Sequence, residues 1–442
     1  MSNSQSILQN TEVGSIPSHW DVVPFREVCT ESAFGPRFSG NLYSPDGNVA
    51  TLRTTDVDDW GRISYSTMPL AKLDTEKFEK HFLKSGDLVI TRSGTCGRTA
   101  IFEDFHVPVI PGAFSIRFRL SSQADNRFFR YYFNSNIGRQ RVIALTTGTV
   151  QPNLTSTALL NLKVPLPPLD EQKAIARILS SLDDKIQLNQ QMNGTLEAIA
   201  RAIFKSWFVD FDPVRAKMDG RQPAGMDAAT ADLFPNSFEN SLMGKIPKGW
   251  TVIELSKLCR IGRGASPRPI TDPRYLGGSI PWIKIADATK ADGPFLFETK
   301  EGVTEAGKQK SVFLKKGSLI LSNSATCGLP IFIELDGCIH DGWLYFENLK
   351  LITNNYLYHV LLNLSEYLVH LADGSVQKNL NTKLVGSQIV LVPSQEILNK
   401  FEIMSSSIFN KIRENSRESR TLSAIRNVLL SQLLSGKVRT NL

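Results

Sequence analysis

The stretch that begins at Leu169 reads LDEQKAIARILSSLDDKIQLNQQMNGTLEAIARAIFKSWF, and it predicts one long helix that ends near Phe211. Asp170 and Glu171 place negative charge in the first turn, where free backbone N–H groups and the helix dipole favour it. No proline follows until Pro213. We therefore predict an unbroken helix of unusual length in the middle of the chain.

Apolar and asparagine side chains recur in this helix at alternating intervals of four and three residues. Such a heptad seam is narrower than the apolar stripe of an ordinary surface helix, so the helix needs a partner helix. Asparagine in a seam fixes the register of pairing rather than adding stability. The seam positions are Ile175, Leu179, Leu182, Ile186, Asn189, Asn193, Leu196, Ala200 and Ile203.

The partner is predicted in the C-terminal stretch 395–435, which carries the same seam 226 residues further on (401 − 175). Ser405, Ser419 and Arg426 are weaker members of this seam, but Met404 and Ile425 stand beside it and can substitute. The strong positions are Phe401, Ile408, Ile412, Asn415, Leu422 and Leu429. Two similar long helices in one chain indicate an internal repeat.

The repeat extends beyond the helices. GSIPSHWDVVPFREVC from Gly14 matches GKIPKGWTVIELSKLC from Gly244, an offset of 230 residues (250 − 20). KSGDLVITRSGTCGRTAIF from Lys84 matches KKGSLILSNSATCGLPIFI from Lys315. The chain is therefore two copies of one unit, each a globular domain followed by a long helix.

Short runs rich in β-formers, such as DLVITRSG and FSIRFRL, alternate with two helical stretches, which predicts α+β domains on a mixed or antiparallel sheet. The segment after the first helix is a linker by composition, although Phe234 and Phe238 suggest that it docks on a domain. The predicted divisions are a first domain at 1–168, a helix at 169–212, a linker at 213–240, a second domain at 241–393 and a second helix at 394–437.

Composition is that of a globular protein, with 41% hydrophobic and 21% charged residues and a net charge of +7. This charge permits a nucleic-acid partner without demonstrating one. No apolar run reaches the length of a membrane span, and the N-terminus lacks the apolar core of a signal peptide, so a cytoplasmic protein is expected. The cysteines recur at equivalent repeat positions, Cys29 with Cys259 and Cys96 with Cys327, which favours a core role over zinc or disulfides.

No nucleotide-binding, hydrolase or metalloprotease motif is present. Glu298-Thr-Lys300 after Asp287 or Asp292 has the residue types of a metal-dependent nuclease, but the first half does not repeat it. The repeated VQxNL motif, with Gln151 and Gln377, is interpreted as a turn and helix cap.

The Gly-rich loop TRSGTCGR at 91–98 and its copy in the second half are candidate DNA readers. Arg can contact guanine through two hydrogen bonds, and Ser, Thr and Asn can contact bases or phosphates. Basic residues between apolar neighbours at two equivalent positions are further candidates. The alternative is a surface turn with solvated charges, or basic residues held by Asp56 and Asp287. The candidate DNA-binding residues are Arg53, Arg92, Ser93, Arg98, Lys284, Asn323 and Ser324.

The sequence resembles the specificity subunits of Type I restriction–modification systems. The resemblance rests on PLPPLDEQKAIARILSSLDDKI, AIFKSWFVDFDPVRAKMDGRQPAGM, the SGTCGR loop and the repeated GxIPxxW…VQxNL frame. It implies two target-recognition domains that read a bipartite, asymmetric double-stranded DNA sequence. It also implies that the long helices pair as an antiparallel coiled coil with pseudo-two-fold symmetry and hold two modification subunits.

The resemblance places catalysis in the partners. Modification subunits would carry the S-adenosylmethionine-dependent adenine methyltransferase, and restriction subunits would use ATP and Mg²⁺, whereas this chain would bind no cofactor or metal. We therefore expect a non-catalytic DNA-recognition subunit. The alternatives are a methyltransferase or nuclease that acts alone, and a two-headed structural adaptor without a DNA role. The bases recognised do not follow from the sequence.

Overall fold

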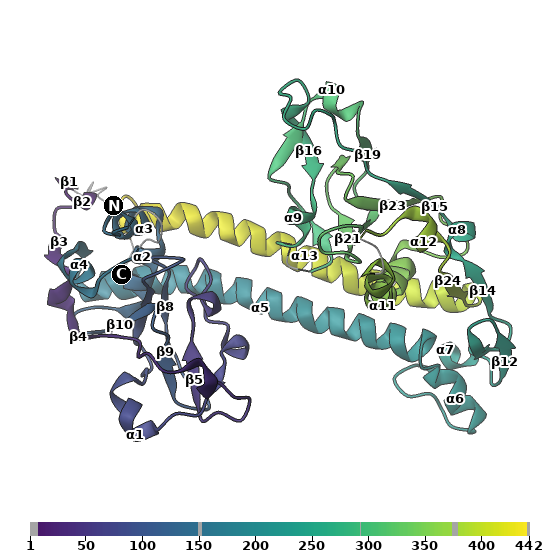
Figure 1. The fold of residues 1–442 in the computed structure, drawn as a ribbon, viewed down its shortest axis with the longest axis horizontal. Coiled ribbons are helices and arrows are strands. Elements are labelled where there is room, and N and C mark those ends of the chain that lie inside the picture. The colour runs from purple at the N-terminus through teal and green to yellow at the C-terminus, as the bar shows by residue number, and fades with distance from the viewer. Residues whose placement is uncertain (1–7, 149–152, 292, 374–378, 440–442) are drawn as a thin grey trace, which may run out of the picture. The chain divides into compact units, whose positions relative to one another are not determined.

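The computed structural model describes residues 8–148, 153–291, 293–373 and 379–439 (Figure 1). The chain forms two compact units: unit 1 comprises residues 1–186 and 420–442, and unit 2 comprises residues 187–419. The boundary between them crosses both long helices. Gln151, Gln377 and Asp292 lie outside the described residues.

Unit 1 is built on an antiparallel four-stranded sheet in the order β4-β10-β7-β8 (Cys29–Phe34, Ser115–Leu120, Leu88–Thr91 and Thr99–Ile101). A second sheet has the order β6-β5-β9 (Leu70–Ala71, Val49–Leu52 and Val109–Pro111), with β5 parallel to β9. Two strand pairs complete the unit, β1-β2 (Leu8–Thr11, Gly14–Pro17) and β3-β11 (Asp21–Pro24, Lys163–Leu166). The helices of this domain are α1 (Thr75–Phe78), α2 (Asn126–Asn134), α3 (Asn136–Ala144) and α4 (Ser156–Asn161).

Unit 2 repeats this plan. Its main sheet has the order β15-β23-β20-β21-β17 (Arg260–Arg263, Trp343–Glu347, Leu319–Ser322, Pro330–Ile333 and Phe295–Leu296). Its second sheet is β18-β16-β22-β19 (Glu301–Val303, Leu276–Ile283, Gly337–Ile339 and Val312–Leu314), again with one parallel pair, β16 with β22. The pairs β12-β13 (Phe238–Ser241, Gly244–Pro247) and β14-β24 (Thr251–Glu254, Ile389–Val392) match those of unit 1. The predicted duplication and α+β class are confirmed.

The helices of unit 2 include two in the segment predicted as a linker, α6 (Asp212–Met218) and α7 (Ala228–Asp232). The others are α8 (Leu255–Leu258), α9 (Ile285–Ala288), α10 (Glu305–Lys308), α11 (Asn354–Asp373) and α12 (Thr382–Gly386). Phe234 is buried, with its ring 5.1 Å from that of Trp207. The segment therefore packs on the core of unit 2, as its aromatic residues suggested.

The two long helices are α5 (Leu169–Phe208) and α13 (Gln395–Leu434), each of 40 residues. They run antiparallel within each unit, because residues with higher numbers in α5 contact residues with lower numbers in α13. In unit 1 Asp183 meets Arg426 at 2.6 Å. In unit 2 Asn189 donates to Glu418 at 2.8 Å, and Asn193 donates to Ser416 at 3.1 Å.

The predicted seam is buried or half-buried throughout. Its buried members include both asparagines of α5 and Asn415 of α13, and Leu182, Leu196, Ile203, Ile408, Leu422 and Leu429 are half-buried. Neither Ile425 nor Met404 substitutes for its weaker neighbour, because Arg426 is 2% and Ser405 1% exposed, whereas Ile425 is 43% exposed and Met404 half-buried. A straight helix drifts relative to a heptad, so Asp183 rather than Leu182 faces inward in unit 1 and provides the anion that Arg426 needs.

Candidate nucleic-acid interface

The loop that follows β7 is fixed by hydrogen bonds to its own backbone. The Thr91 hydroxyl accepts the Arg98 backbone N–H at 3.0 Å, and the Gly97 N–H donates to the Thr91 carbonyl at 2.8 Å. The Cys96 thiol donates to the Arg92 carbonyl at 3.0 Å. Gly97 has a φ of 85°, a conformation that favours glycine. The loop therefore holds its side chains in defined positions.

The loop that follows β20 has the same hydrogen bonds. The Ser322 hydroxyl accepts the Leu329 N–H at 2.8 Å, and Gly328 donates to the Ser322 carbonyl at 2.9 Å. The Cys327 thiol donates to the Asn323 carbonyl at 3.2 Å. The repeated cysteines thus support the loops, and all five cysteines of the chain are free thiols. Burial raises the pKa of the Cys96 thiol, which keeps it protonated as a donor.

Arg92 is a half-buried residue of the unit 1 loop whose guanidinium is oriented by an amide and an aromatic ring. Its Nε and Nη2 donate to the Asn153 side-chain oxygen at 3.2 and 3.0 Å. Its guanidinium carbon lies 4.5 Å from the ring centroid of Phe34. The Leu154 N–H donates to the Arg92 carbonyl at 2.9 Å. Asn153 and Leu154 of the VQxNL motif therefore position Arg92.

The other candidates of unit 1 are buried or held by hydrogen bonds within the unit, although the Arg53 side chain stays 44% exposed. Ser93 is 7% exposed. Arg98 donates to the Asp59 carboxylate at 2.9 Å and to the Val57 carbonyl at 3.0 Å. Arg53 is held by Asp56 through Nε at 3.0 Å and Nη2 at 2.8 Å, the alternative weighed from the sequence. These side chains stabilise the scaffold around Arg92.

In unit 2 the position of Arg92 is taken by Asn323, which is fully buried and donates to the Asp341 carbonyl at 3.1 Å. Ser324 is half-buried beside it. Lys284 is paired with Glu301 at 2.7 Å and lies 4.4 Å from the centroid of the Trp282 ring, which is itself 5.6 Å from the ring of His340, the neighbour of Asp341. The structure therefore gives unit 2 a different surface at the equivalent loop.

Asp341 is the centre of that surface, and sequence reasoning missed it. Its carboxylate accepts from Ser266 at 2.9 Å and from Arg268 at 3.1 Å. Burial raises its pKa, but the Ser266 hydrogen bond and the charges of His340, Arg268 and Arg263 outweigh it, so the pKa lies below the ordinary range. Asp341 is thus an anionic hydrogen-bond acceptor among cationic side chains.

Two exposed aromatic side chains of unit 1 were also missed. Phe34 is 41% and Phe114 55% exposed, and the Arg92 N–H donates to the Phe114 carbonyl at 2.8 Å. An exposed phenylalanine at the end of a strand looks like a core residue in the sequence. The sequence distinguishes Phe114 from a core residue only through the second copy of the repeat, where Gly342 occupies the equivalent position.

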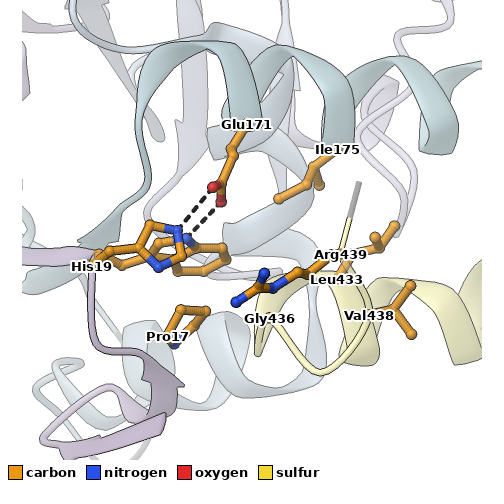
Figure 2. Close-up of a pocket in the computed structure, with 9 residues that line it drawn as sticks. Pro17, His19, Glu171, Ile175, Leu433, Gly436, Val438 and Arg439 are labelled. Atoms are coloured by element: carbon orange, nitrogen blue, oxygen red, sulfur yellow. Dashed lines mark hydrogen bonds and ion pairs between the residues drawn. The ribbon is translucent and has the colours of Figure 1, made fainter. Parts of the chain in front are cut away.

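A pocket of about 360 Å³ lies elsewhere in unit 1, between the N-terminal end of α5 and the C-terminal end of α13 (Figure 2). Its carboxylate, Glu171, accepts from the His19 ring at 2.8 Å and from the Trp20 indole at 2.7 Å.

In unit 2 the Asp287 of the nuclease-like triplet accepts the backbone N–H groups of Lys284 and Lys300 at 3.0 and 3.2 Å. Among the described residues, no group of three or more His, Cys, Asp and Glu side chains could hold a metal ion.

In the described part of the chain, no helix has the length and apolar character needed to cross a membrane.

The "Type I restriction modification DNA specificity domain" family matches residues 17–198 and 247–414. The HindI Type I restriction enzyme specificity subunit of Haemophilus influenzae is 30% identical over 67% of this chain and 74% of its own length. The MjaIX Type I restriction enzyme specificity subunit of Methanocaldococcus jannaschii is 23% identical over 98% of this chain and 96% of its own.

The fold is also that of a solved structure. The Type I restriction–modification S subunit from M. genitalium has a TM-score of 0.59 and 17% identity, over 94% of this chain and 96% of that one. The family matches cover both copies of the repeat and extend into both long helices. The chain belongs to the family of Type I restriction–modification specificity subunits.

Proposed function

We propose that each unit recognises one half of a bipartite, asymmetric double-stranded DNA target through the face around its loop, after β7 in unit 1 and after β20 in unit 2. The duplicated loop is the observation that carries the proposal. One hydrogen-bonded scaffold is built twice, and the side chain at the same position differs, with Arg92 in one copy and Asn323 in the other. A constant scaffold with different reading groups suits two half-sites of different sequence.

The chemistry of the two faces supports direct readout of bases. Arg92 is a partly exposed cation whose fork is oriented by Asn153, and arginine is the usual partner of guanine in the major groove. Asp341 is an acceptor, and carboxylates accept hydrogen bonds from the exocyclic amino group of cytosine. The net charge of +7 favours additional contacts to phosphates, which fix position without reading sequence.

We infer that the chain is a non-catalytic part of a larger complex. Two modification subunits would carry S-adenosylmethionine-dependent adenine methylation, and restriction subunits would use ATP and Mg²⁺. The absence of nucleotide-binding and hydrolase motifs from the sequence supports this division. The purified chain alone is expected neither to methylate nor to cut DNA, and turnover by a rigorously purified sample would contradict the division.

The test is an exchange of one domain. Residues 21–164 are replaced by the matching domain of a relative with a different target, and methylated adenines are mapped in cells that contain the modification subunits. One half-site should change and the other should stay. The reciprocal exchange of residues 251–390 is the matched control and should change the other half-site. Simultaneous change of both half-sites in either exchange would contradict independent recognition.

A further inference from the structure

We propose that Phe114, with Phe34 beside it, contacts the methyl group of a thymine next to a guanine that Arg92 reads. Unit 1 would then recognise a half-site in which a G·C pair lies beside an A·T pair. This inference rests on the proposed function and names the bases that one of the two faces prefers.

Arg92, Phe34 and Phe114 are neighbouring residues at one end of the main sheet of unit 1. Strand register pairs Ile116 with both Ile90 and Phe34. Arg92 follows β7 and Phe114 precedes β10, each two residues from a member of this row. The Arg92 guanidinium lies 4.5 Å from the Phe34 ring, and the Arg92 backbone N–H donates to the Phe114 carbonyl, so the three residues are neighbours.

Exposure makes the two aromatic residues a contact surface rather than a core. Phe114 is 55% and Phe34 41% exposed, although most phenylalanines of the unit 1 core are fully buried. Isolated exposed apolar residues are ordinary, whereas a group of them rimmed by polar residues marks an interaction site. Here they flank a cation, and that combination suits an anionic partner with apolar groups in its groove.

DNA presents those groups side by side in the major groove. Guanine offers two acceptors, N7 and O6, and thymine offers the only apolar group, its 5-methyl. Asn153 receives the Nε and Nη2 of Arg92 on one side, which leaves Nη1 at the opposite end of the guanidinium for an external acceptor. Phe114, the more exposed ring, is then available to a methyl group on the neighbouring pair.

Unit 2 lacks this arrangement at its equivalent positions. Thr91 pairs with Ser115 as Ser322 pairs with Trp343, so Gly342 corresponds to Phe114. Phe34 pairs with Ile116, the residue after Ser115, and Arg263 pairs with Leu344, the residue after Trp343. Arg263 therefore corresponds to Phe34. The methyl contact is therefore assigned to unit 1 alone, and the second half-site is an internal control.

The experiment uses the full chain assembled with its modification subunits, on duplexes that carry the mapped target. Each thymine of the unit 1 half-site is replaced in turn by deoxyuridine, which removes only the methyl group. One replacement beside a guanine should weaken binding about fourfold, the factor that one buried methyl-sized group supplies. Phe114→Ala should bind the thymine and deoxyuridine duplexes equally. Ile143→Ala, a similarly exposed apolar residue of unit 1, should keep the fourfold difference.

The outcomes separate this inference from the proposed function. If the wild-type complex shows no sequence preference, the proposed function fails. If it is sequence-specific, the inference is overturned when the half-site has no G·C pair beside an A·T pair, when no deoxyuridine replacement weakens binding, or when Phe114→Ala keeps the difference. Should Phe114→Ala not assemble, Phe114→Ser serves the same test. Deoxyuridine in the unit 2 half-site should act equally on wild type and variant.

Discussion

At the scale of single residues, His359 is a buried group that must stay neutral. Its ring is stacked between Phe204 and Phe409, with centroids at 5.2 and 5.6 Å, and among the described residues neither ring nitrogen has a hydrogen-bond partner. Burial, and secondarily the charge of Arg201, lower its pKa to about 4. In the unfolded chain the pKa of a histidine is near 6.5, so His359 becomes protonated at a higher pH there than in the folded unit.

We therefore expect acid to destabilise unit 2 through His359. Above about pH 6.5 the residue is neutral in both states and has no effect on the free energy of unfolding. Between about pH 6.5 and 4 the unfolded state gains the proton first, so stability falls by at most about 1.4 kcal/mol per pH unit. His359→Phe should flatten this slope. Denaturant unfolding at several pH values checks it, and an equal slope in the variant would exclude His359 as the cause.

Arg92 and Arg98 are six residues apart but are expected to act differently. Arg92→Ala should remove a base contact, cost about 1–3 kcal/mol on the preferred half-site and relax its sequence. Arg98 is held by Asp59 and Val57, so Arg98→Ala should loosen the loop and weaken binding without changing the preferred base. Selection from a library randomised in the unit 1 half-site distinguishes the two. A changed base preference in Arg98→Ala would make it a reader instead.

At the scale of elements, pairing of the long helices depends on a buried ion pair in unit 1. Asp183 accepts from Arg426 at 2.6 Å and from the Tyr131 hydroxyl at 2.7 Å, and Arg426 also lies over the Trp60 ring at 3.6 Å. Both charged residues are below one-tenth exposed. The network joins α5, α13 and the globular domain of the same unit.

Arg426→Met should destabilise unit 1 by less than the about 3–5 kcal/mol of a fully orphaned buried charge, because Arg130 at 3.3 Å and Arg62 at 3.6 Å still pair with the Asp183 carboxylate. The double variant Asp183→Leu/Arg426→Met should be less stable than Arg426→Met, since it also removes the acceptor that Arg130 and the Tyr131 hydroxyl share. Denaturant unfolding measures both. The exposed pair Lys205–Asp210 is the control, and its loss should cost less than about 1 kcal/mol. Equal stability of the single and double variants would contradict the argument.

The sequence predicted these elements better than their contacts. Heptad spacing and first-turn charge located α5 and α13 to within a few residues, because both patterns are local. The pairing of Arg426 was missed, since its partner Asp183 lies 243 residues away in the chain. The same holds for the loop after β7: its glycines and repeated cysteine are local, whereas the contacts that separate Arg92 from Arg98 come from Asn153 and Asp59, in distant segments.

At the scale of the whole molecule, the two helices are expected to set the gap between half-sites. Each has 40 residues, hence a length of about 60 Å at roughly 1.5 Å per residue. Their seams are continuous, and Asn189 and Asn193 bond to α13 near the middle of α5, which fixes the register of the pair. If each unit binds one half-site as proposed, helix length is expected to determine the length of the spacer.

Removing one heptad from each helix, at positions that face each other, keeps the seam in phase and shortens the pair by about 10 Å. That length corresponds to about three base pairs at roughly 3.4 Å each. The change also rotates one half-site by a little under a third of a turn, at about 10 base pairs per turn, so binding should weaken as the domains twist to follow the groove. Methylated sequences mapped in cells should show the same half-sites with a shorter spacer, or no methylation if the twist is not absorbed.

Removing the heptad from one helix alone is the control and should abolish activity, because it breaks the register. Full activity with the original spacer in the double deletion would mean that the helices do not measure the distance.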